Sequence, residues 1–533
     1  MTDAASASAT PDLPAPKWIG SELARGFTAH QAGRLAEATE CYEHVLAHVP
    51  DEPHALRLLG EIAQRTGNPE RAIELTRRSL ACNPDSPEAH NNIGVALKTI
   101  GRIEEAAQSF RQALRLKPDF RLAHRHLADI LLASGQHDDA ILHFAAAAGL
   151  DGTDAEAITK LGGAFMNADR VEEAYCAFAR AAVLNPTFSY AHQNLGMILV
   201  ERGDLPAAIG AFRCALSLAP QNVAIYAALA GALFRLERFG EAWDAYEQMW
   251  QIPENRRYRE RHGLKLWSGE ALTGRRLLLW GEQGIGDVVL FSTMLPDLLA
   301  TGADIVLEVD ARLVPLFSRS FPQVAVIASG ASLPSCDFQA NIGRLGHVLR
   351  TSTAAFTDSA PYLVPDPARV TSFRQRYSAI AAGPKIGISW RSKSDAYRRK
   401  SLSLDAFEPL FSVFPEAVFV SLQYGDTADE RAAFEQRFGA KIVHDDSFDN
   451  WTDLDGLAAQ IAALDHVVTV SNLNAHFAGA QGKPAHVLTM THTLWYWPQG
   501  KTTTPWYPSI TLHPIVSGRP EATVAAIASS LRP

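Results

Sequence analysis

A period of 34 residues runs through the N-terminal half of this 533-residue chain and constrains the fold more than any other feature. Small residues let two antiparallel helices approach closely, an aromatic residue fills the space between them, and proline ends the second helix. The period therefore predicts a stack of about seven helical pairs. The recurring residues are Gly26, Gly60, Gly94, Ala128, Gly162, Gly196 and Ala230; Ala38, Ala72, Ala106, Ala140, Ala174, Ala208 and Ala242; Tyr42, Phe110, Phe144, Phe178, Phe212 and Tyr246; and Pro50, Pro84, Pro118, Pro186 and Pro220.

This pattern resembles the tetratricopeptide repeat, an α-solenoid unit. Such arrays curl into a superhelix whose concave face usually binds a protein or peptide. Amide side chains at equivalent positions of successive units can hydrogen-bond an extended peptide backbone without reading its sequence. A solvated helix face is the alternative interpretation. The residues that we expect to bind the partner are Asn91, Asn92, His126, Gln193 and Asn194.

Composition excludes several classes of protein. A formal net charge of -9 argues against a nucleic-acid binder, and no apolar run reaches the ~18 residues of a membrane span. Five scattered cysteines without a CxxC pair indicate a reducing compartment, so we expect a cytoplasmic protein with neither disulfides nor a zinc site. Residues 1–17, rich in Ala, Ser and Pro, predict a disordered tail and not a signal peptide.

The second half alternates apolar strands with helical stretches from Leu277 onward, which predicts parallel sheets of the doubly wound α/β kind. A turn-rich stretch from Tyr362 separates two such sheets, or lobes. We therefore expect an array over 18–252, a linker over 253–274, a first lobe over 275–380 and a second lobe over 381–533. The expected strands are Leu277–Trp280, Asp304–Val309, Val324–Ala328, Lys385–Trp390, Val418–Leu422, Lys441–Val443, Val467–Val470 and Ala485–Leu488.

The stretch from Gly281 to Asp287 opens the first lobe as strand, glycine-rich turn and helix. Gly284 and Gly286 let the backbone come close to a ligand, and Asp287 would project into the crevice above the strand ends. The alternative is a tight turn in which Asp287 only caps the helix over Val288–Leu299.

Polar clusters follow the strands of the second lobe, where the carboxyl ends of parallel strands converge on a ligand crevice. A cationic group beside a helix N-terminus suits a nucleotide phosphate. His476 could donate to a phosphate oxygen or the leaving group, or it could be a core histidine. The aromatic loop with Trp495, Trp497, Trp506 and Tyr507 could stack on a base or lie in the core. The expected nucleotide-sugar ligands are Gly284, Gly286, Ser389, Trp390, Arg391, Arg399, Lys400, Gln423, Tyr424, Ser471, Asn472 and Asn474.

Two motifs carry a second resemblance. The strand–GxGD–helix at Gly284–Asp287 and the stretch SNLNAHFAGAQGKP over 471–484 are similar to those of the heptosyltransferase-like glycosyltransferases, a two-lobed GT-B family. The resemblance implies that Asp287 is the catalytic base and that Arg399 and Lys400 lie at the donor phosphate. Ser471 stands where many members have aspartate, and Asn472 where they have threonine, so the resemblance does not extend to ADP-heptose as the donor.

Repeats fused to such a domain resemble bacterial tetratricopeptide glycosyltransferases, some of which modify flagellin with nonulosonic acids such as pseudaminic acid. The resemblance implies transfer from a nucleotide-sugar to a serine or threonine of a bound protein, with Asp287 accepting the hydroxyl proton and Arg391, Lys400 and His476 stabilising the departing phosphate. The Asp453-Leu-Asp455 pair begins a helix, so we expect neither a metal nor a cofactor besides the donor. A non-catalytic scaffold and a heptosyltransferase acting on a cell-envelope glycan are the alternatives.

Overall fold

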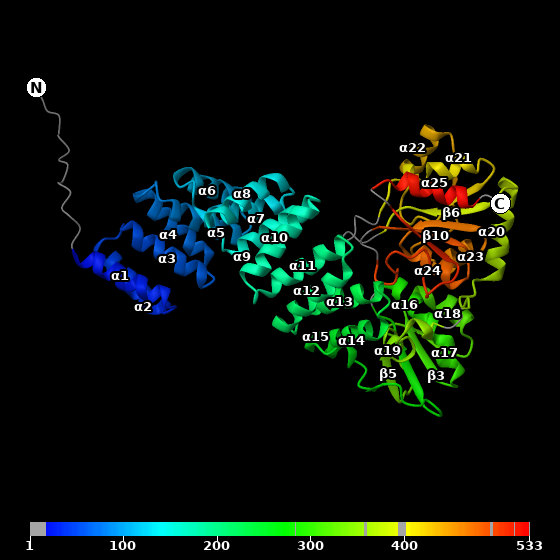
Figure 1. Ribbon diagram of the computed structural model, residues 1–533. Coiled ribbons are helices and arrows are strands. Elements are labelled where there is room, and N and C mark those ends of the chain that lie inside the picture. The colour runs from blue at the N-terminus through cyan, green and yellow to red at the C-terminus, as the bar shows by residue number, and fades with distance from the viewer. Residues whose placement is uncertain are drawn as a thin grey trace, which may run out of the picture. The chain divides into compact units, whose positions relative to one another are not determined.

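The computed structural model describes residues 17–282, 284–356, 360–392, 401–490, 494–515 and 518–531. The chain forms two compact units, one ending at Asn194 and the other beginning at Leu195, so that the boundary falls within helix α11 (Ser189–Glu201) (Figure 1). The tail predicted over 1–17 lies outside the described residues except for Lys17, with which the first helix begins.

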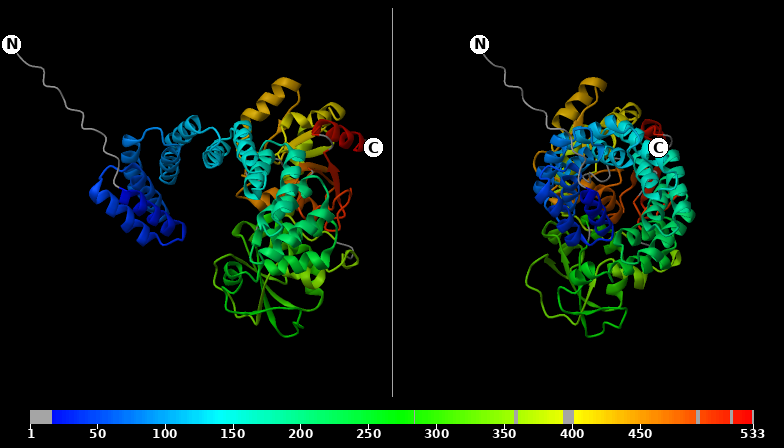
Figure 2. Two further views of the ribbon diagram at one scale, coloured as in Figure 1. Left: turned by 60° about the vertical axis from the view of Figure 1, so that its left-hand side comes forward. Right: turned by 90° about the vertical axis from the view of Figure 1, so that its left-hand side faces the viewer.

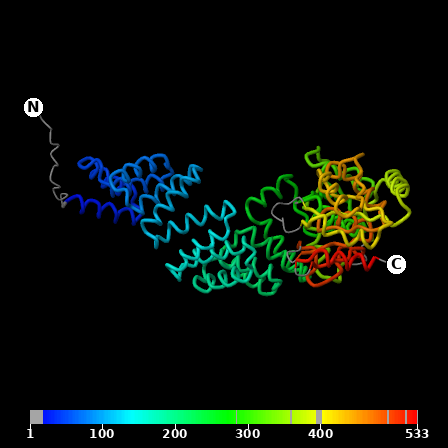
Figure 3. The backbone as a smooth tube through the Cα atoms, turned by 90° about the horizontal axis from the view of Figure 1, so that it is seen from above, coloured from blue at the N-terminus to red at the C-terminus, as the bar shows by residue number. Residues whose placement is uncertain are grey.

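The first unit consists of helical pairs that follow one another in chain order (Figures 2 and 3). Each helix packs on its pair partner and on the next pair, as the 34-residue period predicts. The tetratricopeptide-like solenoid expected for the N-terminal half is thereby confirmed. The helices are α1 (Lys17–Gln31), α2 (Leu35–His48), α3 (Pro53–Arg65), α4 (Pro69–Cys82), α5 (Pro87–Thr99), α6 (Ile103–Leu116), α7 (Arg121–Ala133), α8 (His137–Leu150), α9 (Ala155–Asn167) and α10 (Val171–Leu184).

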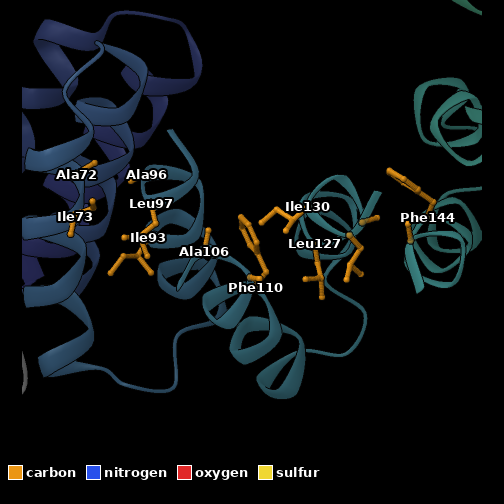
Figure 4. Packing of buried hydrophobic residues seen from close by; sticks show 14 of the residues in the cluster. Ala72, Ile73, Ile93, Ala96, Leu97, Ala106, Phe110, Leu127, Ile130 and Phe144 are labelled. Atoms are coloured by element: carbon orange, nitrogen blue, oxygen red, sulfur yellow. The ribbon is translucent and has the colours of Figure 1, made fainter. Parts of the chain in front are cut away.

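The repeated glycine exists because of the repeated aromatic residue. Phe110 of α6 is fully buried against α5, and a Cβ placed on Gly94 of α5 would come within 2.7 Å of its ring. Gly162 and Phe178 repeat this relation at 2.6 Å. Figure 4 shows Phe110 extending toward the helix that carries Leu127 and Ile130, so each aromatic side chain joins neighbouring pairs.

The second unit contains the remaining helical array and two parallel sheets. Its helices before the first sheet are α12 (Leu205–Leu218), α13 (Val223–Arg235), α14 (Phe239–Met249) and α15 (Pro253–Arg259). Sheet A has the order β1-β5-β2-β3-β4 and sheet B the order β11-β10-β9-β6-β7-β8. The strands are β1 (Lys265–Leu266), β2 (Arg276–Trp280), β3 (Asp304–Val309), β4 (Ala325–Ala328), β5 (Phe338–Asn341), β6 (Lys385–Ser389), β7 (Val418–Ser421), β8 (Ile442–Val443), β9 (His466–Val470), β10 (Ala485–Thr489) and β11 (Ile510–Pro514).

Sheet B, and sheet A apart from its edge strand β1, start in the middle, grow to one edge and return to the other side. The order therefore reverses between β2 and β5 in sheet A, and between β6 and β9 in sheet B. These are the topological switch points at which open α/β sheets hold ligands. The helices beside the sheets are α16 (Ile285–Phe291), α17 (Leu295–Ala300), α18 (Val314–Ser320), α19 (Arg344–Leu349), α20 (Pro367–Ile380), α21 (Glu408–Val413), α22 (Ala428–Phe438), α23 (Leu454–Ala462), α24 (Leu473–Ala480) and α25 (Pro520–Ser530).

Helix α14 packs against α19, which lies beside sheet A. The Trp243 ring of α14 is fully buried and occupies the space that a side chain at Gly346 of α19 would need, and its Nε1 donates to the Arg350 carbonyl at 2.9 Å. Glu247 of α14 binds Arg259 of α15 at 2.8 Å and also pairs with Arg344 of α19. The last helical pair and the first sheet therefore share one core.

Two predicted elements differ from the structure. The segment 253–274, expected as a linker, contains α15 and the edge strand β1, because Arg259 is buried in an ion pair and β1 pairs with β5. The helix expected over Val288–Leu299 is broken into α16, a 3-10 turn over Ser292–Met294 and α17. Pro296 explains the break, since its ring clashes with the carbonyl four residues earlier and it lacks an N–H group.

Replacing Phe110 by Ala should destabilise the first unit by about 3–5 kcal/mol, because it empties a fully buried site between two pairs. Phe27→Ala is the matched control, since that ring is 46% exposed and should change stability by less than about 0.5 kcal/mol. Urea unfolding of the full chain followed by helical circular dichroism measures both. Equal shifts in the two variants would contradict the packing argument.

Candidate functional site

Asp287 lies in the first turn of α16, directly beyond the carboxyl end of β2. Its side chain is half-buried, and its Oδ2 accepts a hydrogen bond from Gly284 N at 3.2 Å. The capping geometry weighed as the alternative is therefore present. It does not block the carboxylate as a proton acceptor, since an ionised carboxylate has about four lone-pair sites.

The glycine-rich loop meets the helix of sheet B that carries His476. Helices α16 and α24 are in contact, and a Cβ on Gly286 would come within 3.1 Å of His476 Cδ2. Gly286 is thus a glycine because an imidazole edge occupies the space beside it. The loop following β2 and the loop following β9 lie side by side, which brings the two predicted motifs together.

His476 is fully buried and uncharged. Its Nδ1 lies 3.3 Å from the Tyr507 hydroxyl, and its ring stacks on Trp497 at 5.8 Å between centroids. Burial lowers the pKa of His476 to about 3. A neutral imidazole can donate one hydrogen bond, but it supplies no positive charge to a phosphate at neutral pH.

Asp287 interacts electrostatically with Tyr507, the hydroxyl neighbour of His476. Burial raises the pKa of the Tyr507 hydroxyl, and the neighbouring Tyr362, Tyr496 and Asp287 raise it further. Tyr362 also donates to the Val289 carbonyl of α16. Two tyrosines and the imidazole therefore form a buried polar cluster against the helix that carries Asp287.

The strand ends of sheet B are joined by buried hydrogen bonds. Gln423 Oε1 accepts from Trp390 N at 3.0 Å, from Arg391 N at 2.8 Å and from Ser389 Oγ at 3.1 Å. Asn472 Nδ2 donates to Ser389 Oγ at 2.8 Å, and its Oδ1 accepts from Asn474 N at 3.0 Å at the start of α24. These predicted ligands come together across the β6/β9 switch point, where they hold the loops in place.

Accessible side chains at this switch point are fewer than the sequence predicted. Arg391 keeps 41% of its side chain exposed while pairing with Glu430 at 3.2 Å, and Tyr424 is half-buried. Ser471 Oγ instead accepts from Trp497 Nε1 at 2.7 Å, and Trp390 is fully buried. Arg399 and Lys400 lie outside the described residues.

A pocket of about 460 Å³ adjoins Gln423 and Tyr424 at the ends of β7 and β8. Residues from His444 to Asn450 form the opposite wall of the pocket. They were not predicted from the sequence as site residues, although the apolar strand that precedes them indicates a loop at the ligand crevice. Asp426, Asp446 and Asp449 line it, so the pocket suits hydroxyl and amino groups and disfavours phosphate.

The aromatic loop belongs to the core. Trp497, Trp506 and Tyr507 are buried, and Trp495 stacks on Phe291 of α16 at 5.5 Å between centroids. Their burial favours the core interpretation over stacking on a base or sugar. Asp453 of the Asp-x-Asp pair caps α23 by accepting from Gly456 N at 2.8 Å and pairs with Arg369.

On the repeats, the predicted amides are less exposed than expected. Asn91 is 5% exposed, and Asn92 is half-buried. His126 stacks on Phe110 at 5.2 Å, and burial, followed by the nearby Lys98 charge, lowers its pKa to about 4. Gln193 and Asn194 are half-buried, and Asn194 Nδ2 donates to the carbonyl of Tyr190 in its own helix.

A charged row next to His126 was missed. Asp129 of α7 pairs with Lys160 of α9 at 2.9 Å and with Lys98 of α5 at 3.6 Å, so three successive pairs are linked. The signal in the sequence is that Lys98, Asp129 and Lys160 alternate in charge at a spacing of 31 residues, which places them on successive repeats.

These features define a tetratricopeptide-repeat array followed by two parallel α/β sheets. Family models described as "Tetratricopeptide repeat" match residues 29–92, 91–155 and 194–255. The chain is similar to Protein FlbA of Caulobacter vibrioides, with 35% identity over 358 residues, which is 62% of this chain and 59% of FlbA. It thus spans less than two thirds of the length of that bacterial relative.

Two solved structures match part of the chain. MamA from Desulfovibrio magneticus RS-1 is 26% identical, with 32% of this chain and 96% of MamA covered and a TM-score of 0.30. The pilF protein of Pseudomonas aeruginosa is 17% identical, with 39% and 96% covered and a TM-score of 0.35. No helix among the described residues is long and apolar enough to cross a bilayer.

The buried His476 should make the second unit sensitive to acid. Its pKa is near 6.5 when unfolded and about 3 when folded, so the unfolded state binds more protons and stability falls as pH drops below 6.5. Between pH 7 and 5, His476→Phe should lose about 2 kcal/mol less stability than the parent chain. The exposed His54→Gln is the control. Urea unfolding at both pH values decides, and an unchanged loss in His476→Phe would refute the neutral imidazole.

Proposed function

We propose that this chain transfers a sugar from a nucleotide-sugar to a serine or threonine hydroxyl of a protein held by the repeat array. The observation that carries the proposal is the contact between Gly286 and His476, because it joins the switch-point loop of sheet A to that of sheet B. Ligands of open α/β sheets bind at such points. The array supports a protein acceptor, since repeats of this class bind peptides.

In the proposed reaction, the acceptor hydroxyl oxygen bonds to the anomeric carbon while the bond from that carbon to the donor phosphate breaks. Asp287 takes the hydroxyl proton. Arg391 stabilises the charge that develops on the departing phosphate, and the backbone N–H groups of Asn472 and Leu473 contribute donors at the start of α24. Neutral His476 holds α24 against Gly286 and offers at most one hydrogen bond.

The donor's nucleoside would occupy the pocket beside Tyr424, whose carboxylates suit ribose hydroxyls and base amino groups. Arg399 and Lys400 remain predicted phosphate ligands, and the donor remains the one small molecule that the reaction needs. We extend the proposal to flagellin as acceptor and to a nonulosonic acid such as pseudaminic acid as the sugar, on the resemblance of the two motifs and the repeats. The cytoplasmic location predicted from the cysteines belongs to the same proposal.

Asp287→Asn should lower the transfer rate about 10²–10⁴-fold, because it removes the proton acceptor while keeping an oxygen for the Gly284 N–H group. Intact-mass analysis of flagellin co-expressed with the chain and a nonulosonic acid supply measures transfer. Asp304→Asn is the control, since this carboxylate is exposed and pairs with Arg276 at the start of β3. If the parent chain adds no mass to any protein, the non-catalytic scaffold is favoured. If the parent chain modifies a cell-envelope glycan, the heptosyltransferase alternative is favoured.

Tyr424→Ala should weaken nucleotide binding about tenfold or more, because stacking of a base on an aromatic ring contributes roughly 1–3 kcal/mol. Titration calorimetry with CMP, UDP, ADP and GDP measures the change and identifies the preferred nucleotide. Tyr258→Ala removes a half-exposed ring on α15 and should leave the affinity unchanged. Unaltered binding in Tyr424→Ala would remove this pocket from the donor site.

A further inference from the structure

Glu282 is the first acidic residue after β2 and is 4% exposed. Its Oε1 accepts from Asn341 Nδ2 at 2.8 Å and from Gly343 N at 2.7 Å, both at the end of β5. Its Oε2 is buried without a hydrogen-bond donor. The carboxyl group thus spans the switch point of sheet A, five residues before Asp287.

A third element reaches the same carboxyl group from the repeat array. The Tyr246 hydroxyl of α14 hydrogen-bonds Glu282. A Cβ on Gly343 would overlap Glu282 Oε1 and would come within 2.7 Å of the Tyr246 hydroxyl and 3.1 Å of Phe291 of α16. Position 343 therefore has room only for glycine, since the side chains of the β2 loop, α14 and α16 converge there.

The charged and titratable groups that face Glu282 come from two helices. Tyr246 lies on α14, and Arg259 lies on α15, where Glu247 holds it. The pKa of Tyr246 is raised by burial, then by Glu282, and also by Asp287 of α16. Glu247 also pairs with Arg344 of α19. Burial raises the pKa of Glu282 to about 7, against the opposing hydrogen bonds and the Arg259 charge.

We propose that Glu282 is a positioning residue that ties the last helix of the repeat array to the loop carrying Asp287. Glu282 and Asp287 belong to one strand–loop–helix turn, so displacement of the Glu282 side chain moves the backbone from which Asp287 projects. Because the Tyr246 hydroxyl hydrogen-bonds Glu282, the position of that turn depends on α14. The role in sugar transfer rests on the proposed function, whereas the tie itself does not.

Hydrogen–deuterium exchange of the full chain tests the tie without requiring a substrate. Glu282→Ala should raise exchange of the α16 amides tenfold or more and also raise that of α14, because both lose a buried partner. Tyr246→Phe should raise exchange in α16 although the substitution lies on α14. Glu282→Gln should stay near the parent chain, because its amide oxygen still accepts from Asn341, from Gly343 N and from the Tyr246 hydroxyl.

Glu260→Gln and Tyr258→Phe are the controls, since both positions lie on the exposed side of the α15 region. If Tyr246→Phe changes exchange only in α14, or Glu282→Ala leaves α16 at the parent level, the tie is refuted. A variant that fails to fold is replaced by the milder Tyr246→Phe, which decides alone.

The pH dependence of the melting temperature tests whether the Glu282 carboxyl group takes up a proton in the folded protein. The pKa of Glu282 is about 7 when folded, above its usual 4.5, so the stability it contributes is present below pH 4.5 and is lost as pH rises through 7. Glu282→Gln lacks this loss, and its melting temperature should rise relative to the parent chain between pH 5 and 8. Parallel curves would overturn the assignment.

Transfer assays then distinguish this inference from the proposed function. If sugar is transferred, Glu282→Ala should lower kcat more than it raises KM, because Asp287 is displaced while the donor pocket is untouched, and an equal effect on both would count against positioning. If no sugar is transferred by the parent chain, the proposed function fails, and the exchange result still decides the tie.

Discussion

A buried ionic network between the repeat array and the first sheet holds the second unit together. Glu247 of α14 binds Arg259 and Arg344, and Arg259 also donates to Asn341 Oδ1 at 3.1 Å. Removing one partner of such a network leaves an uncompensated buried charge, at a cost of about 3–5 kcal/mol. The last helical pair therefore cannot move as an independent repeat, which makes the array's end part of the α/β core.

The same pair contacts the loop that follows β10 of sheet B. The loop after β10 reaches it through Gln499 N, which donates to the Arg235 carbonyl at 3.0 Å, and through Lys501, which pairs with Glu237. Trp495 of that loop packs on Phe234 and Phe291, one from the array and one from α16. Helices of the array thus contact the loops of both sheets.

Several strands could not be predicted, and β5 shows why. Its sequence, Phe338-Gln-Ala-Asn, reads as polar loop, yet Gln339 is 1% exposed and Asn341 fully buried. Gln339 satisfies its amide with Trp280 Nε1 at 2.8 Å and the Arg259 carbonyl at 2.8 Å. These partners lie 59 and 80 residues away, so no local pattern reveals that the side chains can be buried. The strands β2, β3, β7 and β9 were predicted because most of their side chains are apolar, so that the sequence alone indicates their burial.

The sequence by itself determined the helical period, the parallel α/β class and the glycine-rich turn that carries Asp287, because each depends on side-chain size and polarity repeated over short distances. Only the tertiary structure decided that His476 is neutral, that Ser389, Gln423 and Asn472 bond one another, and that Glu282 shares its carboxyl group with α14. Protonation and accessibility depend on what surrounds a side chain. Those surroundings are assembled from strands and helices far apart in the chain.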